Sequence, residues 1–375
     1  MKYTLLASLV LLSSTAHALT QVGDFGDNPG ALTMFEHVPA GFVGVMPLVL
    51  VLHGCAQDSD YAQDVGLVDF ADELGFGLVV AQQVGSNNVN GCFNWFEPND
   101  ARPGLGEAAS LANMIVDFKA RHDVDNGRVF VTGLSAGGAM TAVMLAVDPE
   151  VFAAGAVFAG VPYRCATNLT SALSCNTASA TKTQAEWAAR VTDVVEYNGA
   201  WPRLLVVHGS ADGTVNVKNA DDLTLQFTGL HGLPTTPTSL STVAPLTTKR
   251  WRVNGVDVVK SVVVAGMGHG TPVDPPSCGT AGAFVLDTDF CGSLAALEFF
   301  GLVDGDEPGE GEGEGEGEGE GEAGEGEGEA GEGEGEGEGE GEGEGEAGEG
   351  SCDCSSTSTG VVGIALLAIL RRRRR

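Results

Sequence analysis

Short apolar runs alternate with longer amphipathic segments between residues 19 and 303. Six runs predict strands: residues 47–52, 77–81, 128–132, 152–158, 204–207 and 262–264. Continuous hydrophobicity of this kind is typical of strands that are covered on both faces. Within residues 107–121, apolar side chains follow the i, i+3, i+4, i+7 spacing of a helix, and a second predicted helix begins at Ser135 and ends before Pro149. The alternation predicts one α/β domain over residues 19–303, with a mostly parallel central sheet.

A glycine-flanked serine follows the third predicted strand. The sequence Gly133-Leu134-Ser135-Ala136-Gly137 connects that strand to the helix of small residues that comes next. A strand-to-helix turn this sharp requires nearly bare neighbours, and it exposes the serine hydroxyl at the edge of the sheet. The chain has 55 Gly, so the motif alone is weak, but its context makes Ser135 the candidate nucleophile.

A serine nucleophile needs a histidine as its base and an acid that orients the histidine. Where the serine lies on this type of turn, the acid comes next along the chain and the histidine follows the acid. His269 lies in a glycine-rich loop just after the strand at residues 262–264, where a catalytic histidine is expected. Asp212 follows the strand at residues 204–207 and is the candidate acid, although an aspartate before a glycine is also typical of a simple turn. His208 ends that strand, and we interpret it as a packing residue or a wall of the site.

An oxyanion hole needs two backbone N–H groups. One is expected from Ala136, the residue after the nucleophile, and the other from the loop after an earlier strand. Here the first predicted strand runs into His53-Gly54-Cys55, so the Cys55 N–H is the second candidate donor.

These segments together resemble one family. The stretches LVLVLHGCAQ, CFNWF, RVFVTGLSAGGAMTAVM, FAAGAVFAGVPY, HGSADGTV and GMGHG resemble the secreted esterases that include polyhydroxybutyrate depolymerases, feruloyl esterases and acetylxylan esterases. The resemblance spans about residues 35–300. It implies an α/β-hydrolase fold, a triad of Ser135, Asp212 and His269, and an oxyanion hole from Cys55 and Ala136. It also suggests that Asn94 and Trp95 line the site.

Six cysteines lie in the domain, and they allow 15 pairings. Cys55 and Cys92 follow strands that are neighbours in an α/β-hydrolase fold, Cys165 and Cys175 close a short loop, and Cys278 and Cys291 flank another. Disulfides are the expected state outside the cytoplasm. No CxxC or HxxxH spacing occurs in the domain, so no metal site is expected, and ester hydrolysis by a serine needs no cofactor.

The negative charge of the chain is concentrated near its end. The formal net charge is −32, and residues 304–350 hold 20 Glu and 2 Asp with no base. An almost pure Gly-Glu repeat has no side chains that could form a core, which predicts a disordered, extended linker. The first 303 residues are still acidic, with 28 acids and 14 bases. This argues against nucleic acid as a partner, because DNA and RNA surfaces are met by Lys and Arg.

The two ends of the chain carry export and anchoring patterns. Lys2, the apolar run at residues 5–12 and Ala16-His17-Ala18 predict a signal peptide over residues 1–18. Residues 351–375 combine a Cys-Asp-Cys motif, eleven apolar residues and five arginines, and resemble the tripartite sorting signals of bacterial surface proteins. As a helix, eleven residues rise only about 16 Å, short of a hydrocarbon core of about 30 Å. A processing protease is therefore an expected partner, and the membrane is contacted through this segment before processing.

The sequence thus favours a secreted, surface-anchored serine esterase that acts on polyester or on feruloyl or acetyl esters of plant polysaccharide. The substrate is expected to be polymeric or oligomeric, although an added polymer-binding domain, common among polyester depolymerases of this family, is replaced here by the acidic linker. Two alternatives stay open: an inactive surface-binding protein on a hydrolase scaffold, and a serine peptidase of the same fold.

Overall fold

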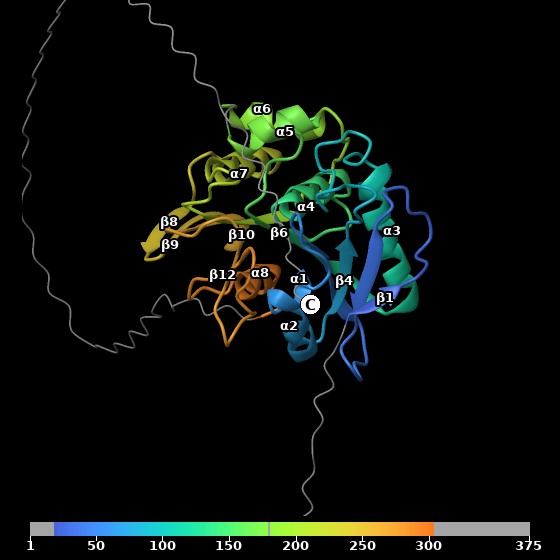
Figure 1. Ribbon diagram of the computed structural model, residues 1–375. Helices are drawn as coiled ribbons and strands as arrows, with labels where there is room; N and C mark the ends of the chain where they lie inside the picture. Colours follow the sequence, from blue (N-terminus) through green and yellow to red (C-terminus); the bar gives the residue numbers. More distant parts are fainter. Residues whose placement is uncertain (1–18, 179–180, 304–375) are drawn as a thin grey trace, which may run out of the picture. The chain divides into compact units, whose positions relative to one another are not determined.

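The central feature of the structure is a ten-stranded sheet in the order β1-β2-β4-β3-β5-β6-β7-β10-β9-β8 (Figure 1). The computed structural model describes residues 19–178 and 181–303. The expected signal peptide, acidic linker and C-terminal segment lie outside these residues. Within the described ranges, no helix combines the length and the apolar character that a membrane crossing requires.

The strands are β1 (Thr20–Val22), β2 (Thr33–His37), β3 (Met46–Leu52), β4 (Gly77–Gln82), β5 (Val124–Leu134), β6 (Ala154–Phe158), β7 (Arg203–Gly209), β8 (Ser239–Val243), β9 (Leu246–Val253), β10 (Val256–Val264), β11 (Thr271–Val273) and β12 (Val285–Asp287). The helices are α1 (Tyr61–Asp64), α2 (Leu67–Leu74), α3 (Gly106–Arg121), α4 (Ala136–Val147), α5 (Leu169–Asn176), α6 (Gln184–Thr192), α7 (Lys218–Leu230) and α8 (Gly292–Phe300).

The middle of the sheet is parallel and its two margins are antiparallel. Strands β4, β3, β5, β6, β7 and β10 run in the same direction. Strands β1 and β2 extend one margin, and β9 and β8 extend the other, in antiparallel pairs. The six parallel strands are those that the sequence predicts, so the expected α/β class is confirmed. Their carboxyl ends share one edge, where loop side chains from different strands can meet.

Helices cover both faces of the sheet, and each face has its own hydrophobic core. Along β3, Leu48, Leu50 and Leu52 face the core beneath α3, α4 and α7. Val49 and Val51 face the opposite core, beneath α1, α2 and α8. Figure 1 shows α4 to α7 on one side of the sheet and α1, α2 and α8 on the other. This two-sided burial explains why the strand reads as one continuous apolar run.

Candidate active site

Ser135 lies in a strained turn between β5 and α4. Its φ is 57°, in the left-handed region that costs energy for a residue with a side chain. A Cβ at Gly133 would lie 2.6 Å from the Leu52 carbonyl oxygen, and one at Gly137 would lie 2.2 Å from the same atom. The tight packing of the turn against the end of β3 therefore excludes any side chain at these two positions. It leaves Ser135 half-buried at the carboxyl edge of the sheet.

Two further loops at this edge hold an aspartate against a histidine. The loop after β7 is bonded to the loop after β10, because the Ser210 N–H donates to the Val264 carbonyl at 3.0 Å and the Ala211 N–H to the Met267 carbonyl at 2.9 Å. His269 Nδ1 lies 2.7 Å from Asp212 Oδ2. The pairing of Asp212 with His269 thus depends on backbone contacts between loops that are more than 50 residues apart in the sequence.

The environment of Asp212 keeps it ionised. Burial is the largest single influence on its pKa and raises it, because the charged form loses hydration. Hydrogen bonds from His208, His269 and the Val215 N–H outweigh that influence and hold the pKa well below its ordinary range. Oδ1 accepts from the N–H groups of Thr214 and Val215, each at 2.8 Å. A fixed carboxylate is the group that orients a catalytic imidazole and stabilises its charged form.

His208 contributes more to this site than the sequence indicated. Its side chain is fully buried, and its Nε2 lies 2.9 Å from the Val215 carbonyl oxygen and 3.3 Å from Asp212 Oδ2. Both neighbours are acceptors, which assigns the ring hydrogen to Nε2. His208 Nδ1 is buried without a partner among the described residues. The signal in the sequence was the spacing of four residues between a strand-terminal histidine and the candidate acid.

The expected oxyanion donors lie on segments that pack together. A Cβ on Gly54 would meet the Leu134 carbonyl oxygen at 3.4 Å, so the loop after β3 contacts the turn that carries Ser135. Within the described part of the chain, the N–H groups of Cys55 and Ala136 donate no hydrogen bond. Two free donors on segments that contact each other at the turn of Ser135 fit the requirement of the oxygen of a tetrahedral intermediate.

Ser135 Oγ and the His269 ring form no hydrogen bond, judged over the ranges that the structure describes. Because Nδ1 of His269 is bonded to Asp212, Nε2 is the nitrogen left to exchange a proton. Catalytic hydrogen bonds of this kind are often long before substrate binds.

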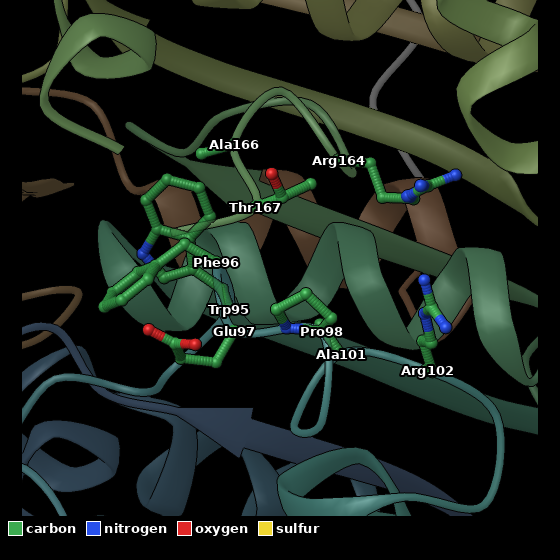
Figure 2. Close-up of a pocket in the computed structure, with 9 residues that line it drawn as sticks. All are labelled: Trp95, Phe96, Glu97, Pro98, Ala101, Arg102, Arg164, Ala166 and Thr167. Carbon is green, nitrogen blue, oxygen red and sulfur yellow. The ribbon is translucent and has the colours of Figure 1, made fainter. Parts of the chain in front are cut away.

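Trp95 and Asn94 have different surroundings. Trp95 and Phe96 line a pocket together with Pro98, Ala101, Arg102, Arg164 and other residues (Figure 2). The Asn94 side chain instead donates to Glu107 Oε1 at 2.9 Å, and its backbone N–H donates to Glu107 Oε2 at 2.7 Å. Glu107 is fully buried and also accepts from Gln83 and Asn87. Asn94 therefore fixes the loop that carries Trp95, and is not among the residues that line this pocket.

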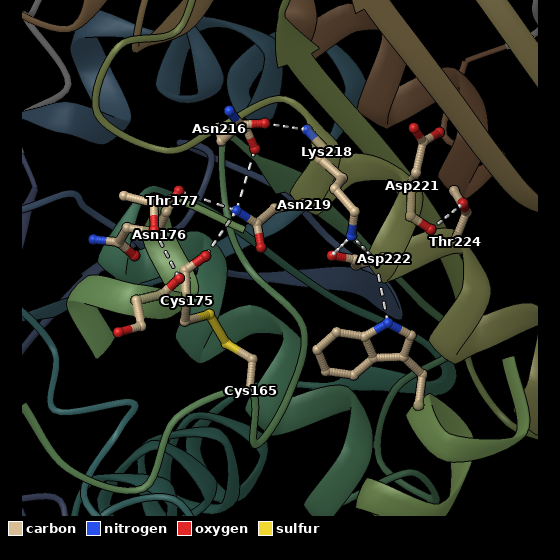
Figure 3. A network of polar contacts seen from close by, with 12 residues as sticks. Cys165, Cys175, Asn176, Thr177, Asn216, Lys218, Asn219, Asp221, Asp222 and Thr224 are labelled. Carbon is tan, nitrogen blue, oxygen red and sulfur yellow. Dashed lines mark hydrogen bonds and ion pairs between the residues drawn. A yellow bond between two sulfur atoms is a disulfide. The ribbon is translucent and has the colours of Figure 1, made fainter. Parts of the chain in front are cut away.

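The two aspartates of α7 are engaged away from the candidate triad. Both carboxylate oxygens of Asp222 lie 2.8 Å from Lys218 Nζ, and Oδ1 also accepts from the Trp187 indole at 3.2 Å (Figure 3). Asp221 pairs with Lys249 at 2.7 Å. Over residues 19–178 and 181–303, the structure has no group of three or more His, Cys, Asp or Glu side chains arranged to hold a metal ion.

All six cysteines of the domain are paired. The disulfides are Cys55–Cys92, Cys165–Cys175 and Cys278–Cys291. The first ties the loop of the candidate oxyanion donor to the loop that carries Trp95. The second lies beside the Asp222 network in Figure 3. Three disulfides in one domain are typical of proteins that fold in an oxidising compartment.

Comparisons with known proteins agree on one family. Residues 33–241 match the family described as "Esterase PHB depolymerase". A poly(3-hydroxyalkanoate) depolymerase C from Paucimonas lemoignei is 45% identical over 301 residues, covering 79% of this chain and 73% of the relative. An acetylxylan esterase from Coprinopsis cinerea is 32% identical, covering 74% of each chain. A feruloyl esterase B from Talaromyces stipitatus is 30% identical, covering 72% of this chain and 77% of the relative.

A solved structure supports the same assignment. The acetyl xylan esterase from Aspergillus awamori superimposes with a TM-score of 0.66 at 26% identity, covering 76% of this chain and 100% of that one. The fold, the family match and the curated relatives therefore agree: the chain belongs to the esterase PHB depolymerase family and is a serine carboxylic-ester hydrolase.

Proposed function

We propose that Ser135, His269 and Asp212 form the catalytic triad of a secreted esterase. The observation that carries the proposal is the 2.7 Å contact between His269 Nδ1 and Asp212 Oδ2, at the sheet edge that also presents Ser135 in a strained turn. In this mechanism Ser135 attacks the ester carbonyl while His269 takes its proton. His269 then protonates the leaving alcohol and activates the water that frees the acid. The N–H groups of Cys55 and Ala136 stabilise the oxyanion.

The test of the triad combines labelling with kinetics. The wild-type enzyme is expected to react with a fluorophosphonate probe at one site, and Ser135→Ala to lose both labelling and ester turnover with an unchanged melting temperature. His269→Ala and Asp212→Ala should lower turnover by several orders of magnitude, and the losses should not add, because the three residues act as a unit. Retention of most activity by Ser135→Ala would refute the mechanism, and absence of labelling in the wild type would favour an inactive scaffold.

For the substrate, we propose a polyester of short hydroxy acids. The 45% identical relative is named a poly(3-hydroxyalkanoate) depolymerase, whereas the relatives named for acetylxylan and feruloyl esters have about 30% identity. A panel of hydroxybutyrate oligomers, acetylated xylan, methyl ferulate and an amide analogue measures kcat/KM directly. The oligomers should be the best substrates. A higher value for acetyl or feruloyl esters would reject the polyester assignment, and cleavage of the amide would favour a peptidase.

For the location, we propose export through residues 1–18 and transient anchoring through residues 351–375, with residues 304–350 as a spacer. Support comes from the order of Cys motif, short apolar run and arginines in the sequence. The mature protein is expected to end near Cys352 or Cys354, and deletion from Ser351 onward to release active enzyme into the medium. Intact-mass measurement on protein from the native host gives the answer, and a chain ending at Arg375 would reject the processing step.

A further inference from the structure

Two arginines converge on one end of the pocket lined by Trp95. Arg102 makes no ion pair or hydrogen bond through its side chain to any described residue, and Arg164 donates only to the Arg190 carbonyl oxygen at 3.3 Å. Figure 2 shows both guanidinium groups at one end of the pocket and the Glu97 carboxylate at the other. Because like charges repel, two close arginines without an acidic partner form a site suited to an anion.

The pocket is built by loops on either side of the nucleophile strand. The loop after β4 supplies Trp95 and Arg102, and the loop after β6 supplies Arg164. Strands β3 and β5 lie between β4 and β6, and β5 leads into Ser135. The pocket therefore lies on the same edge of the sheet as the candidate triad. The disulfide from Cys92 to Cys55 further joins the first of these loops to the candidate oxyanion loop.

The backbone at Arg164 is held in place before any ligand binds. Its φ is 56°, a left-handed conformation that the surroundings must maintain. The backbone of the neighbouring Tyr163 is bonded twice to the Gln226 side chain. Its N–H donates to Gln226 Oε1 at 2.8 Å, and its carbonyl oxygen accepts from Gln226 Nε2 at 3.0 Å. The Tyr163 hydroxyl donates to the Ala101 carbonyl at 2.9 Å, which links the two loops directly.

Tyr163 lies between the two arginine loops, because it directly precedes Arg164 and its hydroxyl bonds to Ala101, the residue before Arg102. Burial raises its pKa to about 12, while Arg164 and Arg102 both act in the opposite direction through their charges. The direction of these two charge effects agrees with Figure 2, in which both guanidinium groups lie at the same end of the pocket. The bond from Arg164 to the Arg190 carbonyl oxygen limits the freedom that this side chain loses on binding, which favours capture of a carboxylate.

We propose that this pocket is a subsite for the free carboxylate at the end of a short oligoester. This proposal rests on the proposed function and specifies which end of the substrate the enzyme binds. Cleavage of such an oligomer gives an acyl fragment with the hydroxyl end and an alcohol fragment with the carboxyl end. Arg102 and Arg164 hold the carboxyl end of the alcohol fragment, and Trp95 and Phe96 contact its aliphatic units. The enzyme therefore prefers chain ends with a free carboxylate.

The test compares a 3-hydroxybutyrate trimer that ends in a free acid with the same trimer as its methyl ester. We expect the wild type to prefer the acid, through a lower KM, and the preference to decrease with added salt because the interaction is partly exposed. Arg164→Ala and Arg102→Ala should each lower kcat/KM for the acid by about 10-fold to 100-fold, the range for a lost charge-assisted hydrogen bond, and change the methyl ester by less than about 2-fold.

The controls separate this subsite from the triad and from folding. Arg128→Ala removes an exposed arginine that donates to the Gly301 carbonyl, and it should leave the acid preference unchanged. Turnover of p-nitrophenyl butyrate, which has no carboxylate, should persist in all three variants. Calorimetry measures binding of the acid trimer to Ser135→Ala and to the same variant that also carries Arg102→Ala and Arg164→Ala. This comparison tests the subsite even if another residue proves to be the nucleophile. Equal losses for acid and methyl ester, or no loss for either, would overturn the proposal.

Discussion

His208 Nε2 and His269 Nδ1 approach the same oxygen of Asp212, at 3.3 Å and 2.7 Å. The two imidazoles come from β7 and from the loop after β10, and they are the titratable groups that face this carboxylate. Asp212 is therefore held from both sides, with the N–H groups of its own turn bonded to its other oxygen.

Replacement of His208 tests this arrangement. His208→Leu removes the N–H donor, so the pKa of Asp212 should rise toward its ordinary value of 3.8. Because that pKa is depressed in the folded state, ionised Asp212 contributes stability above pH 4 that is lost as pH falls. The stability lost between pH 5 and pH 3 should be smaller in the leucine variant than in the wild type. Turnover at pH 7 should decrease by at most about 10-fold. Unfolding curves at several pH values and steady-state kinetics measure both effects.

His208→Gln is the matched control, since its terminal amide can place an N–H near the position of Nε2. It should restore most of the turnover and most of the acid-side pH dependence. If the glutamine and leucine variants behave alike, His208 acts by packing alone.

Glu107 should make the protein less stable at higher pH. Burial raises its pKa from 4.5 to about 8, although hydrogen bonds from Asn94, Gln83 and Asn87 oppose the shift. A carboxyl with a raised folded-state pKa contributes stability below its unfolded pKa and loses that contribution as pH rises through about 8. Between pH 5 and pH 8 the slope can reach about 1.4 kcal/mol per pH unit. Glu107→Gln should flatten this part of the stability profile, measured by urea unfolding. An unchanged slope would show that Glu107 is ionised throughout.

The Cys55–Cys92 disulfide should matter for turnover as well as for stability. It closes a sequence separation of 37 residues and joins two loops of the candidate site. We expect the double alanine variant to lose about 2–4 kcal/mol of stability and to lose activity well below its melting temperature. Removing Cys278–Cys291, whose second cysteine is the N-cap residue of α8, should cost stability with little change in kcat. Equal effects on kcat from both removals would contradict a local role for Cys55–Cys92.

Gly137 should tolerate no side chain. A Cβ there would lie 2.2 Å from the Leu52 carbonyl oxygen and 2.5 Å from that of His53, and both atoms belong to backbone that cannot move without distorting β3. Gly137→Ala should destabilise the domain by about 3 kcal/mol or more, which is at or above the largest cost typical of substitutions that overpack a core. Gly213→Ala, next to Asp212, is the control, because its Cβ would meet no atom within 4 Å. Thermal unfolding of the two variants provides the comparison, and similar melting temperatures would contradict this packing argument.

The sequence by itself determined the parallel core and predicted which residues act at its carboxyl edge. Strands buried on both faces must be apolar along their whole length, so β3 to β7 and the buried part of β10 were visible as runs. The bare turn around Ser135 was visible as well, because local sterics dictate its glycines. The antiparallel margins were not predicted, since β8 is exposed along its whole length and β1 has only three residues.

Only the tertiary structure decided which distant groups share a site. Glu107 and Arg164 carry no local signature, because their roles depend on partners brought together by the sheet order and by loop-to-loop hydrogen bonds. The contact between His269 and Asp212 follows from the packing of β7 against β10, whereas His208 lies only four residues before Asp212. The pair Arg102 and Arg164 follows from the placement of β4 and β6 on opposite sides of β3 and β5. The periodicity of a sequence indicates which residues of one segment are buried. The electrostatics of a site depend instead on contacts between segments that are distant in the sequence, and local patterns do not show which segments meet.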